Sequence, residues 1–294
     1  MSYVPSASEM AYAKVNLALH LVERLPNGYH QLDSIVAFVD IGDQLQATIN
    51  PQGTLQLSID GAYGQNLPTE DNLIIRAAQC LQQQAQLSMG AHIRLSKHIP
   101  VGAGLGGGSA DAAAALRLLN RLWGLGYSDA MLAELGEQLG ADIPACIFSQ
   151  ATRMEGIGEQ LTAMPYVPSM PLLLVYPNVP LWTPDVYRAM TNKPFSGRLS
   201  AIPSIGSSMD SWIQWLQQCG NDLEYAAHTL NPHIATMLQA LAFVDGCMLA
   251  RMSGSGSACF GIFATNEHAA AAEQKIRSAH PSWWVRASQI LTNI

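Results

Sequence analysis

Residues 100–116 read PVGAGLGGGSADAAAAL, and this stretch decides how the chain is interpreted. Glycine occupies positions 102, 104 and 106–108, and a run of helix-forming alanines follows directly. The segment AHIRLSKHI (91–99) before it alternates polar and apolar residues, which predicts a strand. A strand, a loop of bare backbone amides and a helix N-terminus together favour an anion such as a phosphate group. Ser109 is the predicted N-cap of this helix.

Two well-known phosphate loops fit these residues poorly. A Walker A loop needs Gly-Lys-Ser/Thr, whereas the chain has Gly-Gly-Gly-Ser at 106–109. The dinucleotide pattern GxGxxG is met by Gly102, Gly104 and Gly107, but no acidic residue ends a second parallel strand about 20 residues later. A flexible turn without a ligand is the remaining alternative. The glycines beside a helix start favour a phosphate site over such a turn.

The composition describes a folded protein that does not attract polyanions. The chain has 294 residues, of which 49% are hydrophobic and 13% charged, so a substantial core can be buried. The formal net charge of -7 disfavours binding to nucleic acid, and an anionic small ligand needs local positive groups. The sequence does not indicate an oligomeric state.

The cysteines and the N-terminus predict a cytoplasmic location. The five cysteines are odd in number, far apart and without the spacing of metal ligands, so free thiols are expected and a structural zinc site is not. The chain begins without the basic start and apolar run of a signal peptide. No apolar stretch approaches the roughly 20 residues that cross a bilayer, so no membrane partner is expected.

The first half of the chain predicts strands followed by helices. Apolar runs in the first 60 residues are separated by expected turns at PNGYH (26–30) and at Gly42-Asp43. Helical spacing begins after Asn72, in LIIRAAQCLQQQAQL. A further helix is expected after a cap at Ser128, ending at Gly140.

The second half predicts a ferredoxin-like domain. The composition changes at PYVPSMP (165–171), which sets the expected domains at residues 1–165 and 166–294. Beyond it the order is strand, helix, strand, strand, helix, strand, which is the split βαβ arrangement. The predicted fold class is therefore α+β, with a β-rich α/β N-terminal domain and a ferredoxin-like C-terminal domain.

The glycine loop resembles that of the GHMP kinase superfamily, whose pattern is proline, a few residues, Gly-Leu, small residues and Ser-Ser-Ala-Ala. Further segments match in order: AYAKVNLALHLVERLPNGYHQLDSIVAFVDIGD (11–43), TEDNLIIRAA (69–78), LGADIPACIF (139–148), EGIGEQL (155–161), WTPDVY (182–187) and RMSGSGSACF (251–260). The motifs GYH (28–30) and GADIP (140–144) narrow the resemblance to one branch of the GHMP kinase superfamily. That branch uses MgATP to phosphorylate the 2-hydroxyl of 4-diphosphocytidyl-2-C-methyl-D-erythritol, in the non-mevalonate route to isoprenoid precursors. The implied fold is the two-domain GHMP kinase fold.

The resemblance implies a nucleotide site around the glycine loop. Lys97 either offsets phosphate charge or is an exposed lysine at a strand end, and the sequence alone favours the exposed lysine. The usual Ser-Ser is Ser109-Ala110 here, so the missing hydroxyl argues against magnesium ligation at position 110. Ser109 ligates Mg²⁺, caps the helix, or does both in turn, and no residue is committed as a metal ligand. The second glycine loop, Ser253–Ser257, either buttresses this loop or the substrate phosphates, or is a plain tight hairpin. The expected nucleotide-binding residues are Asn72, Lys97, Pro100, Val101, Gly102, Ala103, Gly104, Leu105, Gly106, Gly107, Gly108, Ser109 and Ala110.

Lys14 and Asp142 match the catalytic lysine and aspartate of that branch. Without the resemblance, Lys14 reads equally well as a strand-edge lysine with its amine in solvent, and Asp142 as a cap or turn residue. The resemblance implies that Asp142 orients the acceptor hydroxyl and takes its proton. It implies that Lys14 keeps Asp142 ionised and stabilises charge on the transferring oxygens.

The acceptor site is implied by a second group of residues. Asn16 shares a strand face with Lys14 and either contacts the substrate or supports the lysine. Tyr29 and His30 follow the Asn27-Gly28 turn, and the resemblance places them against cytidine rather than at an exposed hairpin tip. Thr183 and Tyr187 are the expected contacts on the other side of the base, although Tyr187 also fits a core position.

Two other functions compete with this prediction. A different GHMP kinase would act on another alcohol, such as homoserine or mevalonate. A nucleotide-binding module without catalysis would lack the pair of a lysine and an aspartate. The GYH motif argues against the first, and the presence of Lys14 and Asp142 argues against the second.

Overall fold

The computed structural model describes residues 5–190 and 194–292 and separates the chain into two compact units. The first unit takes in Ile41–Val101 and Gly106–Ser149, together with the chain up to Ala13. The second takes in Lys14–Asp40, Gly102–Leu105 and everything from Gln150. The chain therefore passes between the units several times. The expected domain boundary at residues 165–166 stays a prediction.

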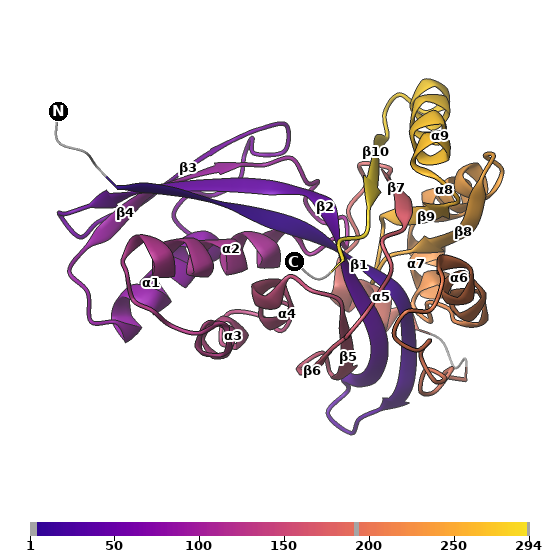
Figure 1. The fold of residues 1–294 in the computed structure, drawn as a ribbon, viewed down its shortest axis with the longest axis horizontal. Helices are drawn as coiled ribbons and strands as arrows, with labels where there is room; N and C mark the ends of the chain where they lie inside the picture. The colour runs from indigo at the N-terminus through magenta and orange to yellow at the C-terminus, as the bar shows by residue number, and fades with distance from the viewer. Residues whose placement is uncertain (1–4, 191–193, 293–294) are drawn as a thin grey trace. The chain divides into compact units, whose positions relative to one another are not determined.

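The elements are drawn in Figure 1. In chain order they are β1 (Ser6–Arg24), β2 (His30–Asn50), β3 (Leu55–Asp60), α1 (Leu73–Gln84), β4 (Gly90–Ser96), α2 (Gly107–Leu122), α3 (Asp129–Glu137), α4 (Ile143–Phe148), β5 (Thr152–Gly156), β6 (Gln160–Ala163), β7 (Pro171–Tyr176), α5 (Thr183–Arg188), α6 (Met209–Gln218), α7 (Glu224–Leu230), α8 (His233–Ala242), β8 (Cys247–Met252), β9 (Cys259–Phe263), α9 (Asn266–Ala279) and β10 (Trp284–Gln289).

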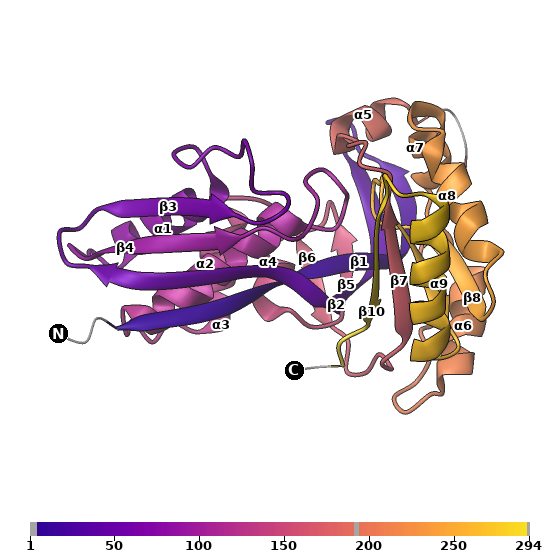
Figure 2. The same ribbon diagram turned by 90° about the horizontal axis from the view of Figure 1, so that it is seen from above.

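The first unit is a sheet covered by helices. β3 runs parallel to β4, and β4 pairs antiparallel with the second half of β2, with Leu45 opposite Leu95. Helices α1 to α4 lie on one face of these strands, as Figures 1 and 2 show. Alternation along β4 explains this arrangement, because Ile93 and Leu95 are buried while His92 and Arg94 are exposed.

The expected turn at Gly42-Asp43 is wrong, because β2 continues through both residues. A Cβ at Gly42 would lie 2.2 Å from the carbonyl oxygen of Ala11 on β1. The glycine therefore allows a close approach of two strand backbones and does not mark a chain reversal. The turn at Asn27-Gly28 is confirmed, since Gly28 has φ +88° between β1 and β2.

Helix α2 starts earlier than the sequence predicts. Its N-cap is Gly106, with φ 68°, and Ser109 lies inside the helix, so the prediction of Ser109 as the cap is wrong. A left-handed φ costs glycine little, which lets the chain turn into the helix three residues sooner. The alanines 112–115 are all buried and allow α2 to pack closely against α1 and α4.

The second unit contains the expected ferredoxin-like sheet. Its four strands have the order β10-β7-β9-β8, all antiparallel. Taking β7, β8, β9 and β10 as the four strands of a split βαβ unit, this is the order 4-1-3-2. α9 packs on β10 and β7, and α8 on β8 and β9. The same unit contains the antiparallel pairs of β5 with β6 and of β5 with residues Leu32–Val36 of β2.

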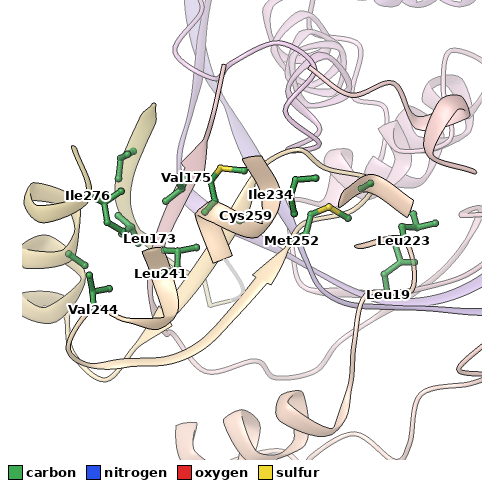
Figure 3. Packing of buried hydrophobic residues seen from close by; sticks show 14 of the residues in the cluster. Leu19, Leu173, Val175, Leu223, Ile234, Leu241, Val244, Met252, Cys259 and Ile276 are labelled. Carbon is green, nitrogen blue, oxygen red and sulfur yellow. The ribbon is translucent and has the colours of Figure 1, made fainter. Parts of the chain in front are cut away.

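The core of the second unit lies between this sheet and its helices, and Figure 3 shows part of it. Leu173 and Val175 of β7 and Ile276 of α9 belong to one buried cluster with Leu241 of α8. Leu19 of β1 joins the same cluster. The part of β1 that follows Lys14 is therefore anchored by apolar packing, which fixes the strand that carries the lysine.

All five cysteines are free thiols, which confirms the sequence prediction. Burial raises the pKa of Cys219, Cys247 and Cys259, as expected for packed thiols in apolar surroundings. Within residues 5–190 and 194–292, no helix is both long and apolar enough to span a bilayer.

Candidate active site

Lys14 lies in the second unit with its side chain almost entirely withdrawn from solvent. The residue is 8% exposed, so the alternative of a strand-edge lysine with its amine in water is wrong. Its backbone N–H donates to the carbonyl oxygen of Leu105, at the end of the glycine loop segment in the same unit, over 3.0 Å. The strand that carries the lysine and this part of the loop are therefore fixed to each other.

A series of hydrogen bonds between polar side chains extends from the Lys14 amine. Nζ donates to Oδ1 of Asn16 over 3.1 Å, and Nδ2 of Asn16 donates to Oγ of Ser34 over 2.9 Å. The Ser34 hydroxyl donates onward to the carbonyl oxygen of Ala18 over 2.6 Å. Both ends of the Asn16 amide are thus engaged, which supports the lysine-holding role predicted for it.

The second glycine loop joins this arrangement. The backbone N–H of Asn16 donates to Oγ of the buried Ser253 over 3.1 Å. A Cβ at Gly254 would lie 3.1 Å from Oδ1 of Asn16. Ser253 belongs to the second glycine loop that the sequence singles out. Ser34 is not among the predicted site residues, and its one sequence signal is a hydroxyl at the start of the apolar run SIVAFV.

Residues 102–105 of the first glycine loop are held by the second glycine loop and by residues 180–181. Gly104 has φ +79°, and a Cβ there would lie 2.5 Å from the carbonyl oxygen of Gly256. The N–H of Ala258 donates to the carbonyl oxygen of Ala103 over 2.9 Å. The predicted contact of the second loop with the first is therefore confirmed within this unit. Glycine is required at 104 for both its backbone angle and its space.

The other flank of the loop belongs to the first unit. Gly106 precedes α2 without a capping side chain, and Gly107, Gly108 and Ser109 form the first turn. The N–H groups of a first turn have no partner within the helix, and α2 has no side-chain cap to satisfy them. This end of α2 is therefore suited to phosphate oxygens.

Lys97 does not reach the surface, so the interpretation of an exposed lysine is wrong. It is 3% exposed, and Nζ donates to Oδ2 of Asp43 over 2.6 Å and to Oδ2 of Asp111 over 2.5 Å. Burial acts to lower the pKa of Lys97, but the two carboxylates outweigh it and leave that pKa raised. Lys97 is therefore a charged partner of two aspartates below the first turn of α2.

Asn72 and residues 100–101 belong to the same unit as Lys97. Asn72 is the N-cap of α1, with Oδ1 accepting from the N–H of Ile74 over 3.0 Å. Pro100 is buried and Val101 is exposed. Nδ2 of Asn72 donates to the carbonyl oxygen of Pro68 over 3.0 Å, so both ends of the Asn72 amide are engaged within the chain segment before α1 and its first turn.

Asp142 lies at the N-cap position of α4 in the first unit, and Pro144 stands in the first turn. Its side chain does not cap the helix, because it makes no hydrogen bond to the first-turn amides. The capping half of the alternative for Asp142 is therefore wrong, and the turn half is confirmed, because residues 141–142 form a turn before α4. Lys14 belongs to the second unit, so the role of the two side chains as a pair stays a prediction.

Two of the predicted cytidine contacts, His30 and Tyr187, belong to an aromatic cluster in the second unit. The ring of His30 stacks on that of Tyr187 at 5.2 Å with an interplanar angle of 30°. Phe195 meets the His30 ring edge-on at 5.7 Å and is an aromatic residue that the sequence did not point to. Burial first, and then the charge of Arg24, lower the pKa of His30, so its imidazole is neutral near pH 7.

Two further predicted residues flank this cluster. Tyr29 is 61% exposed next to the Asn27-Gly28 turn, which leaves its ring open to solvent or to a ligand. Thr183 begins α5, and its hydroxyl lies 2.8 Å from Oγ of Ser255 in the second glycine loop. One loop therefore contacts both the Lys14 side of this unit and the α5 segment that carries Tyr187.

Two family descriptions match the chain. "GHMP kinases N terminal domain" matches residues 72–150, and "GHMP kinases C terminal" matches residues 199–282. The fold is that of a GHMP kinase. A solved homoserine kinase from Cytophaga hutchinsonii has the same fold, with a TM-score of 0.75 at 16% identity over 100% of this chain and 97% of that one.

Relatives with much higher sequence identity show which family of GHMP kinases the chain resembles. A 4-diphosphocytidyl-2-C-methyl-D-erythritol kinase from Paramagnetospirillum magneticum is 43% identical over 98% of this chain and 99% of the relative. One from Bradyrhizobium diazoefficiens is 44% identical over 99% and 100%. The crystal structure of a 4-(cytidine 5'-diphospho)-2C-methyl-D-erythritol kinase superposes with a TM-score of 0.80 at 31% identity, covering 97% of this chain and 99% of that one. The chain belongs to the 4-diphosphocytidyl-2-C-methyl-D-erythritol kinase family.

Proposed function

We propose that this protein transfers the γ-phosphoryl group of MgATP to the 2-hydroxyl of 4-diphosphocytidyl-2-C-methyl-D-erythritol, in non-mevalonate isoprenoid precursor biosynthesis. The observation that carries the proposal is the buried amine of Lys14, fixed by Asn16 and Ser34. Burying an ammonium group is costly unless a partner or a reaction requires it. The full-length similarity to kinases of this name supplies the substrate.

The nucleotide is assigned to the glycine loop and the first turn of α2. ATP is the phosphoryl donor of GHMP kinases. Bare amides at residues 102–108 and the positive end of the α2 dipole suit its phosphate oxygens. No cluster of three or more His, Cys, Asp or Glu side chains that could hold a metal occurs in the described part of the chain. We therefore assign Mg²⁺ to the phosphates of the nucleotide, where it neutralises charge, and name no protein ligand.

Lys14 and Asp142 are assigned to the reacting atoms. Phosphoryl transfer passes through a loose transition state, so alignment and charge neutralisation contribute more than a strong base. The carboxylate of Asp142 orients the 2-hydroxyl and accepts its proton. The ammonium of Lys14 stabilises the negative charge shared by the carboxylate and the transferring oxygens. The 2-hydroxyl is tertiary and crowded, which makes positioning more important.

The cytidine is assigned to His30, Tyr187 and Tyr29. A neutral imidazole can both donate and accept a hydrogen bond, which suits the mixed donor and acceptor edge of cytosine. The His30–Tyr187 stack offers an aromatic surface, and the exposed ring of Tyr29 can cover a base from another side. These residues distinguish the acceptor from homoserine and mevalonate, which have no base to bind.

A comparison of acceptors tests the proposal. The purified protein is incubated with MgATP and one of three alcohols: 4-diphosphocytidyl-2-C-methyl-D-erythritol, homoserine or mevalonate. We expect a new phosphomonoester signal in the ³¹P spectrum with the cytidine compound alone, coupled to one equivalent of ADP. Phosphorylation of homoserine or mevalonate with equal efficiency would instead indicate a different GHMP kinase, and binding of ATP without any transfer would indicate a nucleotide-binding module.

A further inference from the structure

A buried group of three charged side chains lies below the first turn of α2. Nζ of Lys97, just beyond β4, contacts one carboxylate oxygen of Asp43 on β2 and one of Asp111 on α2, over 2.6 and 2.5 Å. The side chains are 4%, 0% and 6% exposed, in the order Lys97, Asp43 and Asp111. We call these residues the Asp43–Lys97–Asp111 cluster.

The cluster ties together the two ends of the glycine loop. Oδ1 of Asp43 accepts from the backbone N–H of His98 over 2.5 Å and from that of Ile99 over 2.9 Å. Asp43 thereby fixes the chain that enters the loop, and Asp111 belongs to the helix that leaves it. The Lys97 amine joins both, so the cluster sets where the first turn of α2 lies relative to β4.

The cluster is also close to the amides of that turn. A Cβ at Gly107, the first residue of α2, would lie 3.1 Å from Nζ of Lys97. Two carboxylates and one ammonium carry a net charge of -1 when both acids are ionised, and zero when one holds a proton. A phosphate group at the first turn of α2 is repelled by the first state and not by the second.

One atom of the cluster lacks a partner. Oδ1 of Asp111 is buried and makes no hydrogen bond to another described residue, whereas Oδ2 contacts Lys97. A buried carboxylate oxygen without a donor is costly, and a proton on it removes most of that cost. The unpartnered oxygen therefore identifies Asp111, rather than Asp43, as the residue that holds the proton.

We propose that Asp111 is a positioning residue of the nucleotide site, and that it takes up a proton when nucleotide phosphates bind at the first turn of α2. This inference rests on the proposed function, which places the phosphates there. Protonation makes the cluster neutral, so the charge beneath the bound phosphates is removed while the Lys97–Asp43 pair keeps the end of β4 in place.

The electrostatics of the unliganded protein agree with this proposal. Burial raises the pKa of Asp111 to about 7, because the opposing effect of Lys97 is partly offset by Asp43. The charges that act on Asp111 are therefore those of Lys97 and Asp43. The helices that pack on α2 bury apolar residues such as Ile74, Leu132 and Ile143. Their titratable groups are Arg76 and Cys80 on α1, Asp129, Glu134 and Glu137 on α3, and Asp142 and Cys146 at α4.

The sign of the expected pH effect follows from the direction of the pKa change. Bound phosphates raise the pKa of Asp111 above its value in the free protein, because their negative charge disfavours ionisation. Below pH 7 the residue already holds its proton, and nucleotide affinity does not depend on it. Above pH 7 binding has to take up the proton, so affinity falls as the pH rises, by about tenfold for each unit by which binding raises the pKa.

Calorimetry with MgADP tests this, because MgADP occupies the site without turnover. The binding heat is measured at pH 8 in two buffers with different ionisation enthalpies, which gives the number of protons taken up. The second pKa of a phosphate group is about 6, so the nucleotide itself adds little proton uptake at this pH. We expect the wild-type protein to take up on the order of half a proton or more. The affinity is then measured from pH 6 to pH 8.5.

Asp111→Asn is the decisive variant, because it imitates the protonated acid and leaves Lys97 paired with Asp43. We expect its proton uptake to be near zero, its affinity for MgADP to equal that of wild type at pH 6, and to exceed it several-fold at pH 8.5. Asp129→Asn is the control, since it removes an exposed carboxylate from the first turn of α3 and should behave as wild type.

The outcomes separate this inference from the proposed function. Normal MgADP binding by the wild-type protein with no proton uptake at pH 8 would overturn the role of Asp111 and leave the kinase assignment intact. Equal uptake by wild type and Asp111→Asn would do the same. Absence of MgADP binding by the wild-type protein at every pH would contradict the proposed function itself. The wild-type measurements stand alone if the variant does not fold.

Discussion

Nζ of Lys14 donates a hydrogen bond of 3.1 Å to Oδ1 of Asn16, two residues further along β1. Residues two apart on a strand share a face, so this contact is local in the chain. The Asn16 amide cannot rotate freely, because its other end donates to Ser34. Asn16 therefore orients Lys14 while Ser34 orients Asn16, which restricts the positions that the Lys14 amine can take.

Asn16→Ala should reduce kcat by about 10- to 100-fold, because a misplaced catalytic group loses much of its effect while the charge remains. The KM for ATP should change less than threefold. Steady-state kinetics with both substrates varied measure the two effects. Ser34→Ala removes the hydrogen bond that holds the Asn16 amide and leaves the contact between Lys14 and Asn16 in place. It should therefore give a smaller loss of kcat than Asn16→Ala. A larger loss for Ser34→Ala than for Asn16→Ala would contradict this order of support.

Asp142→Asn should lower kcat by about 10³-fold, because an amide cannot accept the proton of the acceptor hydroxyl. Affinity for MgADP should stay close to that of wild type, since Asp142 is not assigned to the phosphates. Single-turnover kinetics and calorimetry provide the two measurements, with Asp129→Asn as the control for loss of an exposed acid on a neighbouring helix. Turnover near the wild-type rate would remove Asp142 from the reaction.

His30→Ala should raise the KM for the cytidine substrate by about tenfold or more and leave the KM for ATP unchanged. In the wild-type protein the acceptor KM should be flat above pH 6.5 and increase as the pH falls through the lowered pKa of His30, because protonation removes the acceptor nitrogen of the ring. His280 stacks on Trp283 at 3.8 Å on another part of the unit, so His280→Ala is the matched control. Equal changes in both KM values would argue against a cytidine contact.

Gly104→Ala should raise the KM for ATP by about tenfold, because two costs coincide at this residue. The backbone has φ +79°, which costs an alanine about 1 kcal/mol, and the new methyl group would lie 2.5 Å from the carbonyl oxygen of Gly256. Gly126→Ala is the control, since φ is +69° there and no atom lies within 4 Å of the added Cβ. If both variants bind ATP equally well, the contact between the glycine loops has no part in nucleotide binding.

Local patterns predicted those parts of the structure that depend on local interactions. The strand and helix order after residue 171 required the ferredoxin-like sheet, and the sheet has that order. Ser128 caps α3 as expected, because a serine before a helical repeat has few other uses. The sequence analysis does not predict helix α8, although Ile234, Met237 and Leu241 follow Pro232 at helical spacing and are buried.

Contacts between residues that are far apart in the chain could not be predicted from the sequence. Nothing local distinguishes the buried Lys97 from an exposed lysine, because its partners Asp43 and Asp111 lie 54 and 14 residues away. Asp43 itself was placed in a turn, because a Gly-Asp pair usually ends a strand. Gly42 instead provides room for the backbone of β1, a requirement that depends on the neighbouring strand alone.

Arg251→Met should destabilise the protein by about 3 kcal/mol, because it removes the donors of three buried carbonyl groups. The guanidinium of Arg251 on β8 donates to the carbonyl oxygens of Leu17, Leu216 and Cys219, over 2.6, 2.7 and 2.8 Å. Urea unfolding followed by circular dichroism measures the loss.

Arg277→Met is the control for that measurement. Arg277 is exposed on α9 and pairs with Glu273 one turn away, a contact that should contribute no more than about 0.5 kcal/mol. Arg251→Lys should remain destabilised by more than Arg277→Met, because one ammonium cannot reproduce the planar donors that reach three carbonyls. Since one of these carbonyls belongs to β1 three residues beyond Lys14, Arg251→Met should also reduce kcat at temperatures where it remains folded. Full activity of the folded variant would show that the Lys14 strand keeps its position without Arg251.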